Sequence, residues 1–211
     1  MPLESNAPPA LLIDFGGVIT ESVVGAFERA CIAHGVDPRA FVAEAFAAEH
    51  ASDSPFAMVE LGLVSVPEFV ERIGPVLTRH ASQKVDANAW FSEVQQTTQR
   101  VDGAMVDALQ ALYDRGVRTV LLSNSWGPRD TYPWHLLPDF SDVVVSGEVG
   151  IRKPDPGIYR LACEKAGCDA DECLFVDDVE VNLVPARQLG MSTILHSDRD
   201  TTLAELQRVF G

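Results

Sequence analysis

Positive charge is scarce in this chain of 211 residues, which has 16 lysines and arginines against 31 aspartates and glutamates. The formal net charge is −15 at pH 7. A surface this acidic repels the phosphate backbone of nucleic acids and the headgroups of anionic lipids. The composition therefore argues against binding of nucleic acid or of a membrane surface. An anionic substrate would need a local cation or a metal ion in order to bind.

The chain also lacks a long early apolar segment and any pairing pattern of cysteines. Its early apolar run, Ala10–Ile13, is short and the first cationic residue is Arg29, so we expect neither a secretory leader nor a membrane span. The four cysteines form no C-x-x-C pair and have no histidine at zinc spacing. Free thiols are typical of a reducing compartment, and we therefore expect a cytoplasmic protein.

Apolar residues are nevertheless plentiful, and their periodicity predicts the fold class. At 46% hydrophobic residues the chain is able to bury a core, which excludes disordered and collagen-like classes. Strand patterns occur at residues 10–13, 117–122, 143–145, 173–176 and 193–195. Strands that alternate with helices predict right-handed crossovers and a mainly parallel sheet covered on both faces. We therefore expect an α/β fold, a Rossmann-like doubly wound parallel sheet.

The stretch at residues 21–100 differs, because it shows helical periodicity and no convincing strand. Within it, the segment from Ser65 to Glu68 has the pattern of a capping box at the start of a helix. The sequence therefore predicts a small all-helical domain at residues 21–100, inserted into an α/β core formed by residues 1–20 and 101–211.

Polar side chains follow four of the predicted strands. They are Asp14, Ser123 with Asn124, Lys153, and Asp177 with Asp178. In parallel α/β sheets ligands bind at the carboxyl ends of the strands, so we expect these side chains to converge. Two adjacent aspartates repel each other unless a cation offsets their charge, which favours a metal ion nearby.

This combination of residues is typical of phosphoryl transfer. A carboxylate is able to act as a nucleophile and form an aspartyl-phosphate. Magnesium binds one or two carboxylates together with phosphate oxygens and water. A serine hydroxyl and backbone N–H groups hold further phosphate oxygens, and a lysine neutralises the accumulated charge.

The order and spacing of these residues resemble the motifs of the haloacid dehalogenase (HAD) superfamily. The matching segments are Asp14-Phe-Gly-Gly-Val-Ile-Thr20, Leu-Leu-Ser123-Asn124, Lys153-Pro-Asp-Pro and Phe-Val-Asp177-Asp178. The stretch at 175–191 is similar to the phosphatase domain of soluble epoxide hydrolases and their bacterial relatives, and residues 60–69 resemble a segment of their helical caps. The resemblance implies a magnesium-dependent phosphatase of a small phosphorylated metabolite, with the helical insertion as a cap over the site.

The resemblance also implies which residues bind the metal. Asp14 is expected to be both the nucleophile and a magnesium ligand, and Gly16 to offer its backbone carbonyl. Asp178, four residues before Asn182, is expected to bind the metal directly. Asp177 is expected to support it by hydrogen bonds or through water.

The remaining matches imply phosphate contacts. Ser123 and Asn124 are expected to hold the phosphoryl group, and Lys153 to bridge it to the nucleophile. Trp126 and Tyr132 follow the serine motif, where they either line the mouth of the site or pack a loop.

One departure from the family pattern is Gly16. Active phosphatases of the superfamily usually carry a second aspartate at this position, as general acid and base. We therefore expect a slow phosphatase, with Glu21 or His50 as candidates for the missing proton donor. Arg129 and Arg152 are candidates to supplement Lys153, but the solvated surface is the default for arginine and is where we expect them.

Two alternatives to a phosphatase remain open at the level of sequence. The first is a haloacid dehalogenase-type hydrolase, which would need no metal and would lack the paired Asp177 and Asp178. The second is a non-catalytic binding or regulatory protein of the same fold. The sequence leaves the substrate and the oligomeric state open.

Overall fold

The computed structural model describes residues 10–49 and 54–211, and the strands of this part of the chain form one five-stranded sheet. They are β1 (Ala10–Ile13), β2 (Thr119–Ser123), β3 (Asp142–Val145), β4 (Cys173–Asp177) and β5 (Ser192–Leu195). All neighbouring strands are parallel, in the order β3-β2-β1-β4-β5. The carboxyl end of β1 therefore lies between those of β2 and β4.

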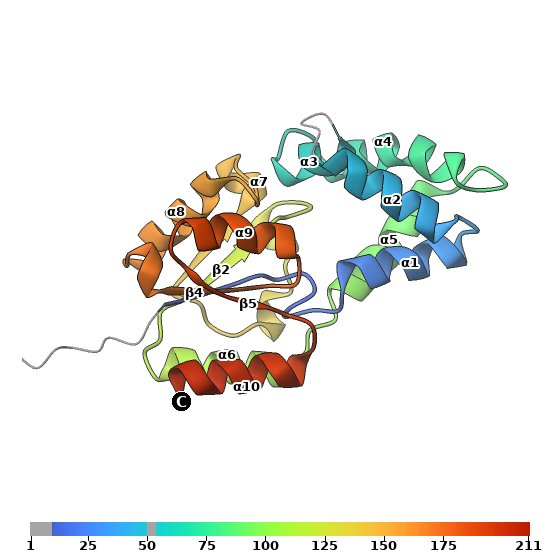
Figure 1. Ribbon diagram of the computed structural model, residues 1–211. Helices are drawn as coiled ribbons and strands as arrows, with labels where there is room; N and C mark the ends of the chain where they lie inside the picture. The colour runs from blue at the N-terminus through green and yellow to red at the C-terminus, as the bar shows by residue number, and fades with distance from the viewer. Residues whose placement is uncertain (1–9, 50–53) are drawn as a thin grey trace, which may run out of the picture.

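Two pairs of helices cover the sheet on opposite faces (Figure 1). They are α6 (Gly103–Asp114) with α10 (Arg199–Phe210), and α8 (Pro156–Ala166) with α9 (Glu180–Gln188). Successive strand residues face opposite sides, so that Leu12 packs in the apolar cluster of α8 and α9 while Leu11 packs in that of α6 and α10. This arrangement confirms the predicted α/β fold with a doubly wound parallel sheet.

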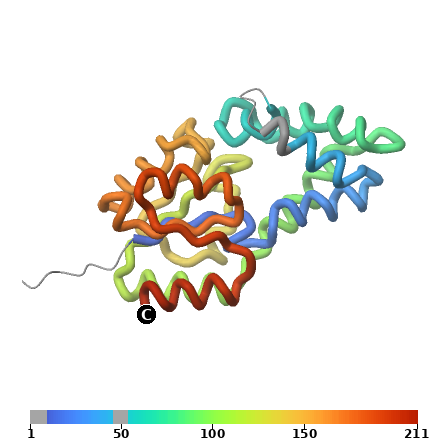
Figure 2. The backbone as a smooth tube through the Cα atoms, viewed as in Figure 1, coloured from blue at the N-terminus to red at the C-terminus, as the bar shows by residue number. Residues whose placement is uncertain are grey.

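The described residues between positions 22 and 99 form a separate helical layer, called here the helical insertion (Figures 1 and 2). Its helices are α1 (Val23–Ala33), α2 (Pro38–Glu49), α3 (Pro55–Glu60), α4 (Val66–Arg79) and α5 (Ala87–Thr98). The layer has its own apolar cluster, in which Phe27, Phe41 and Trp90 are buried. The predicted capping box is confirmed at the start of α4, where Ser65 and Glu68 exchange both hydrogen bonds.

The chain enters and leaves the helical insertion at one place. Thr20 and Val101 form an isolated antiparallel bridge. On either side of it, Asp102 N–H donates to Ile19 O at 2.8 Å and Glu21 N–H donates to Arg100 O at 3.2 Å. The two crossing segments are therefore held side by side.

Short helical elements complete the fold. They are α7 (Ser146–Val149) and 3₁₀ helices at Arg129–Thr131, Trp134–Leu136 and Ala170–Glu172. In the part of the chain that the structure describes, no helix combines the length and apolar character that a bilayer crossing requires.

Two predicted boundaries differ from the structure by two residues or more. The strand predicted from Val117 begins at Thr119, because Val117 N–H still donates to Leu112 O of the preceding helix, at 3.0 Å. The last helix begins three residues earlier than residue 202, because Asp198 caps it by accepting a hydrogen bond from Thr201 N–H at 2.9 Å.

Candidate active site

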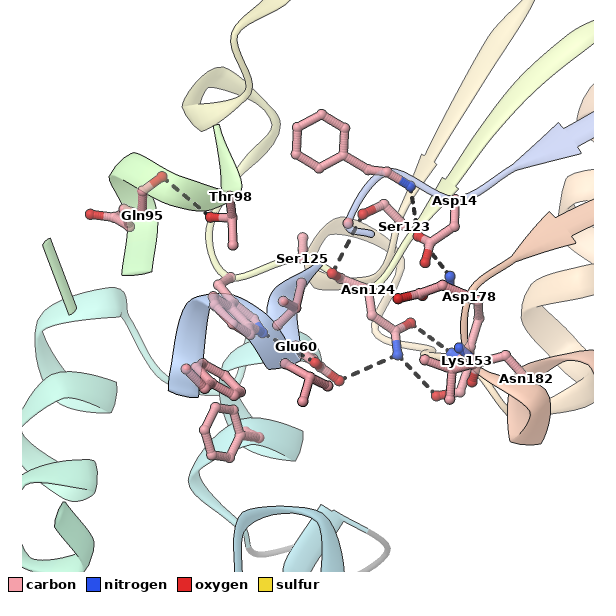
Figure 3. A pocket seen from close by; sticks show the side chains of 18 of the residues that line it. Asp14, Glu60, Gln95, Thr98, Ser123, Asn124, Ser125, Lys153, Asp178 and Asn182 are labelled. Carbon is pink, nitrogen blue, oxygen red and sulfur yellow. Dashed lines mark hydrogen bonds and ion pairs between the residues drawn. The ribbon is translucent and has the colours of Figure 1, made fainter. Parts of the chain in front are cut away.

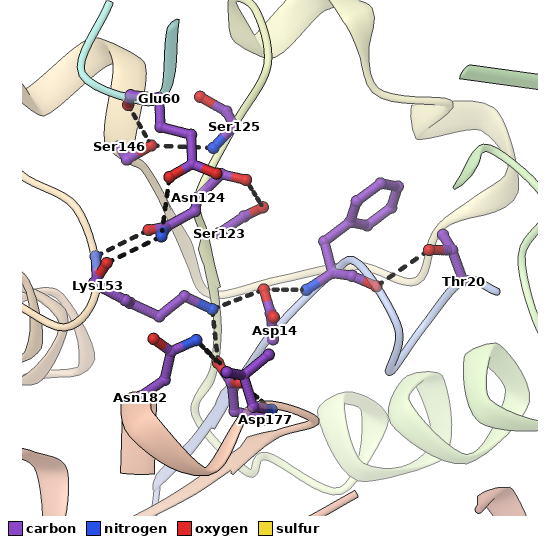
Figure 4. A network of polar contacts seen from close by, with 12 residues as sticks. Asp14, Thr20, Glu60, Ser123, Asn124, Ser125, Ser146, Lys153, Asp177 and Asn182 are labelled. Carbon is purple, nitrogen blue, oxygen red and sulfur yellow. Dashed lines mark hydrogen bonds and ion pairs between the residues drawn. The ribbon is translucent and has the colours of Figure 1, made fainter. Parts of the chain in front are cut away.

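A buried lysine joins two strand ends at the centre of the sheet (Figure 4). Lys153 Nζ lies 2.8 Å from Asp14 Oδ1, just after β1, and 2.7 Å from Asp177 Oδ2, at the end of β4. Burial alone would lower the pKa of Lys153, but attraction to Asp14 and Asp177 outweighs it and raises that pKa above its usual value. The two carboxylates therefore favour the protonated, positively charged form of Lys153.

One cation does not balance the acidic groups around it. Oxygen atoms of Asp14, Asp177 and Asp178 lie within 4.8 Å of one another. The pKa of Asp14 is raised well above its usual value. Burial is the largest cause, attraction to Lys153 opposes it, and repulsion from Asp177 and Asp178 adds to the rise. Burial, and then repulsion from Asp177, raises the pKa of Asp178 to about 6. Such a set of hard oxygen donors with excess negative charge fits a divalent cation such as magnesium.

The two adjacent aspartates have different surroundings. Asp177 is fully buried, and its oxygens accept hydrogen bonds from Lys153 Nζ, from Val179 N–H at 2.8 Å and from Asn182 Nδ2 at 3.0 and 3.2 Å. Asp178 lines the cavity described below. Protein donors therefore surround Asp177, while Asp178 faces the space in which a ligand would bind.

The turn after β1 approaches Asp178 very closely. Gly17 has a φ angle of +82°, and a Cβ atom at this position would lie 2.1 Å from Asp178 Oδ2. Position 17 therefore requires glycine for its backbone angle and for its closeness to the carboxylate.

Gly16 is a different case, because its φ angle is not positive. A Cβ atom at position 16 would lie 2.9 Å from Val23 Cγ2, at the start of α1. Of the proposed replacement proton donors, Glu21 pairs with Arg29 at 2.7 Å and with Arg100 at 3.6 Å, which commits its carboxylate at the chain crossing. His50 lies outside the described residues.

The serine motif ends β2 beside Asp14. Ser123 is buried, and its Oγ accepts a hydrogen bond from Tyr132 Oη at 2.8 Å. The ring of Tyr132 packs on Phe15, with 4.7 Å between the centroids. Tyr132 therefore both packs its loop and orients the hydroxyl of Ser123.

The side chain of Asn124 is held by protein groups. Its Oδ1 accepts from Lys153 N–H at 2.8 Å, and its Nδ2 donates to Lys153 O at 3.0 Å. Nδ2 also donates to Glu60 Oε2 at 3.3 Å. The amide of Asn124 therefore supports the backbone of Lys153.

A cavity of about 180 Å³ opens from these groups toward the helical insertion (Figure 3). Asp14, Lys153 and Asp178 lie at one end, and Gln95 and Thr98 of α5 lie at the opposite side (Figure 3). Apolar side chains of the insertion and of the loop after β2 form much of the remaining wall, among them Val23, Val24, Phe27, Phe56 and Trp126.

Arg152 and Glu60 lie in the site environment in a way that the sequence did not predict. Arg152 was expected at the surface, and this expectation was wrong: its side chain is 10% exposed and its Nη1 lies 2.6 Å from Glu60 Oε2. Glu60 ends α3 and is buried as well. The two residues are far apart in sequence, so no local spacing predicts their contact. By contrast, Arg129 is about half exposed and pairs with Glu148, as expected of a surface arginine.

Comparison with known proteins gives consistent results. Residues 8–190 match the family model described as haloacid dehalogenase-like hydrolase. The chain is 32% identical to pig bifunctional epoxide hydrolase 2, over 96% of its own length but only 39% of that protein. It is 31% identical to a sesquiterpene phosphatase of Aspergillus oryzae, over 53% of the chain and 59% of the relative.

Solved structures share the fold. A HAD family enzyme of Bacteroides thetaiotaomicron, crystallised with magnesium and inorganic phosphate, matches with a TM-score of 0.65 and 24% identity. The match covers 93% of this chain and 98% of that one.

Proposed function

Because the chain belongs to the haloacid dehalogenase-like hydrolases, we propose that it is a magnesium-dependent phosphatase that acts on a small phosphorylated molecule through an aspartyl-phosphate. The observation that carries the proposal is the contact of Lys153 with Asp14 and Asp177, beside the third carboxylate of Asp178. The similarity to a sesquiterpene phosphatase, and the magnesium and phosphate bound by the Bacteroides enzyme, support it.

In the first step, a carboxylate oxygen of Asp14 attacks phosphorus, and the bond from phosphorus to the leaving oxygen breaks. Lys153 opposes the rise in the pKa of Asp14 that burial causes, and it neutralises charge on the phosphoryl group. Ser123, oriented by Tyr132, contacts a further phosphoryl oxygen. Water then attacks phosphorus, which releases inorganic phosphate and restores the carboxylate of Asp14.

The metal would be held by Asp14, Asp178 and the backbone carbonyl of Gly16. Magnesium, when bound, supplies positive charge against which the phosphoryl oxygens are stabilised. Asp177 supports this site indirectly, because its hydrogen bonds fix Lys153 and Asn182.

Gly16 makes the proposed phosphatase a slow one. Its position offers no carboxyl group that could protonate the leaving oxygen or activate the attacking water. Substrates whose leaving groups need little protonation, such as aryl and acyl phosphates, are then hydrolysed best.

We further propose that residues 21–100 act as the cap domain over a core formed by residues 1–20 and 101–211. The walls formed by Val23, Phe27 and Phe56 favour a monophosphate whose organic part is apolar. Lys153 is the cationic side chain among the described residues that line the cavity, which disfavours substrates with a second phosphate.

The decisive experiment is a phosphatase screen of the purified chain with and without magnesium. It includes aryl, acyl, sugar and alkyl monophosphates and a 2-haloacid, and Asp14→Asn serves as the inactive control. Turnover of a phosphate that EDTA and Asp14→Asn both abolish supports the proposal. Halide release without metal would establish a dehalogenase, and no turnover of any compound would favour a binding protein.

A further inference from the structure

The carboxylate of Glu60 is buried at the contact between the helical insertion and the core. It accepts hydrogen bonds from Arg152 Nη1 at 2.6 Å, from Trp126 Nε1 at 3.2 Å and from Asn124 Nδ2 at 3.3 Å. All three donors belong to loops that follow core strands, whereas Glu60 ends α3 of the insertion. One side chain of the insertion therefore joins two loops of the candidate active site.

The contact reaches the reacting groups through a short series of bonds (Figure 4). Asn124, which donates to Glu60, also bonds both the N–H and the carbonyl of Lys153. Lys153 in turn bonds Asp14. The position of Glu60 is thereby connected to the distance between the proposed nucleophile and its cation.

The backbone around Glu60 is equally close to the core. Ser146 Oγ donates to Glu60 O at 2.5 Å. A Cβ atom at Gly62 would lie 2.3 Å from Gly147 O, so only glycine allows this approach. The insertion is thus fixed to the core here, at the end of α3, and again at the chain crossing of Thr20 and Val101.

We propose that Glu60 is a positioning residue: its contact with Arg152, Trp126 and Asn124 forms when the helical insertion closes on the core, and it sets Lys153 against Asp14 for phosphoryl transfer. This inference rests on the proposed phosphatase function. Closure breaks no covalent bond: the insertion moves about its one chain crossing and forms the contacts of Glu60 and Gly62 with the core. Trp126 of the core also packs on Phe27 and Phe56 of the insertion, with ring centroids 5.3 and 6.0 Å apart, and this aromatic contact favours the closed state.

The test compares Glu60→Gln with Glu71→Gln, a matched change at an exposed residue of α4. Glu60→Gln replaces one acceptor oxygen by an NH₂ group. This group is a donor and would face Arg152, Trp126 or Asn124, which are themselves donors. We expect kcat for an aryl phosphate to fall ~10–100-fold, as for a small misplacement of reacting groups, with KM changed less than about twofold. Glu71→Gln is expected to match the unchanged chain.

A second measurement does not depend on turnover. Hydrogen exchange followed by mass spectrometry is expected to become faster in Glu60→Gln at residues 55–64 and in the loops that carry Asn124 and Lys153, but not at α10. If Glu60→Gln does not fold, Glu60→Asp, which keeps the charge and shortens the side chain, is measured in the same way.

The outcomes separate this inference from the proposed function. Absence of magnesium-dependent turnover in the unchanged chain contradicts the phosphatase, and exchange at the Asn124 and Lys153 loops then decides the role of Glu60. The inference is overturned if Glu60→Gln lowers Tm but leaves kcat and the hydrogen exchange of the Asn124 and Lys153 loops unchanged. Such a variant has lost only stability.

Discussion

Val23 occupies the space beside Gly16, since a Cβ atom at position 16 would lie 2.9 Å from Val23 Cγ2. The contact determines which substitutions are needed to place a general acid and base at position 16. Gly16 has no positive φ angle, so its backbone accepts aspartate, but the rigid branched side chain of Val23 obstructs it. Gly16→Asp alone is therefore expected to gain little.

We expect Gly16→Asp combined with Val23→Ala to raise the turnover of an alkyl phosphate by ~10²-fold or more, the usual contribution of a positioned acid and base. The measurement is kcat for alkyl and aryl phosphates, and the gain should be smaller for the aryl substrate. Val23→Ala alone is the control. A folded double variant that binds magnesium and gains nothing would mean that another group already supplies the proton.

Magnesium is expected to stabilise the protein through Asp178. A ligand at a hundredfold excess over its Kd contributes about 2.7 kcal/mol, which corresponds to a Tm increase of roughly 5–10 °C for a domain of this size. Asp178→Asn should lose most of the shift in a thermal melt with and without magnesium. Asp107→Asn, an exposed aspartate of α6, should keep it. Equal shifts in both variants would locate the metal elsewhere.

Lys153→Met is expected to abolish turnover and to destabilise the fold in the absence of metal. The substitution leaves Asp14 and Asp177 buried without their cation, and breaking a buried pair costs about 3–5 kcal/mol. Denaturant titration measures this loss, with Lys165→Met, an exposed lysine paired with Asp142, as control. Unchanged turnover would remove Lys153 from the mechanism.

Tyr132→Phe is expected to lower kcat/KM by about 3–10-fold, because Ser123 loses a hydrogen bond of about 0.5–1.5 kcal/mol that orients its hydroxyl. Tyr113→Phe, on α6, should have no effect on turnover. If Tyr132 acts through Ser123, its substitution adds little once Ser123→Ala is present. Fully additive losses would show that Tyr132 acts independently.

The sequence predicted the layers of the fold well, because parallel strands buried on both faces leave continuous apolar runs such as Ala10–Ile13. It also predicted that Asp14, Ser123, Lys153 and Asp177 would meet, since the topology brings strand ends to one edge. These predictions depend on local patterns and on chain order alone.

The sequence did not predict contacts between segments that are far apart along the chain. Arg152 has the composition of a surface residue, and only the approach of α3 buries it against Glu60. The obstruction of Gly16 by Val23 likewise depends on how α1 leaves the chain crossing. The roles given to Asp14, Ser123 and Asp178 remain predictions until the variants above are measured.

The bridge between Thr20 and Val101 has a consequence for the way such a chain acquires new substrates. Asp102 N–H donates to Ile19 O at 2.8 Å, so the chain leaves the core and returns to it across a gap that a few residues could span. Replacing that segment changes the walls Val23, Phe27 and Phe56 without altering the register of any strand. For the proposed phosphatase, recognition of the organic group and chemistry at phosphorus are thereby separable during evolution. The exception is Arg152, for which the incoming segment must again supply a carboxylate.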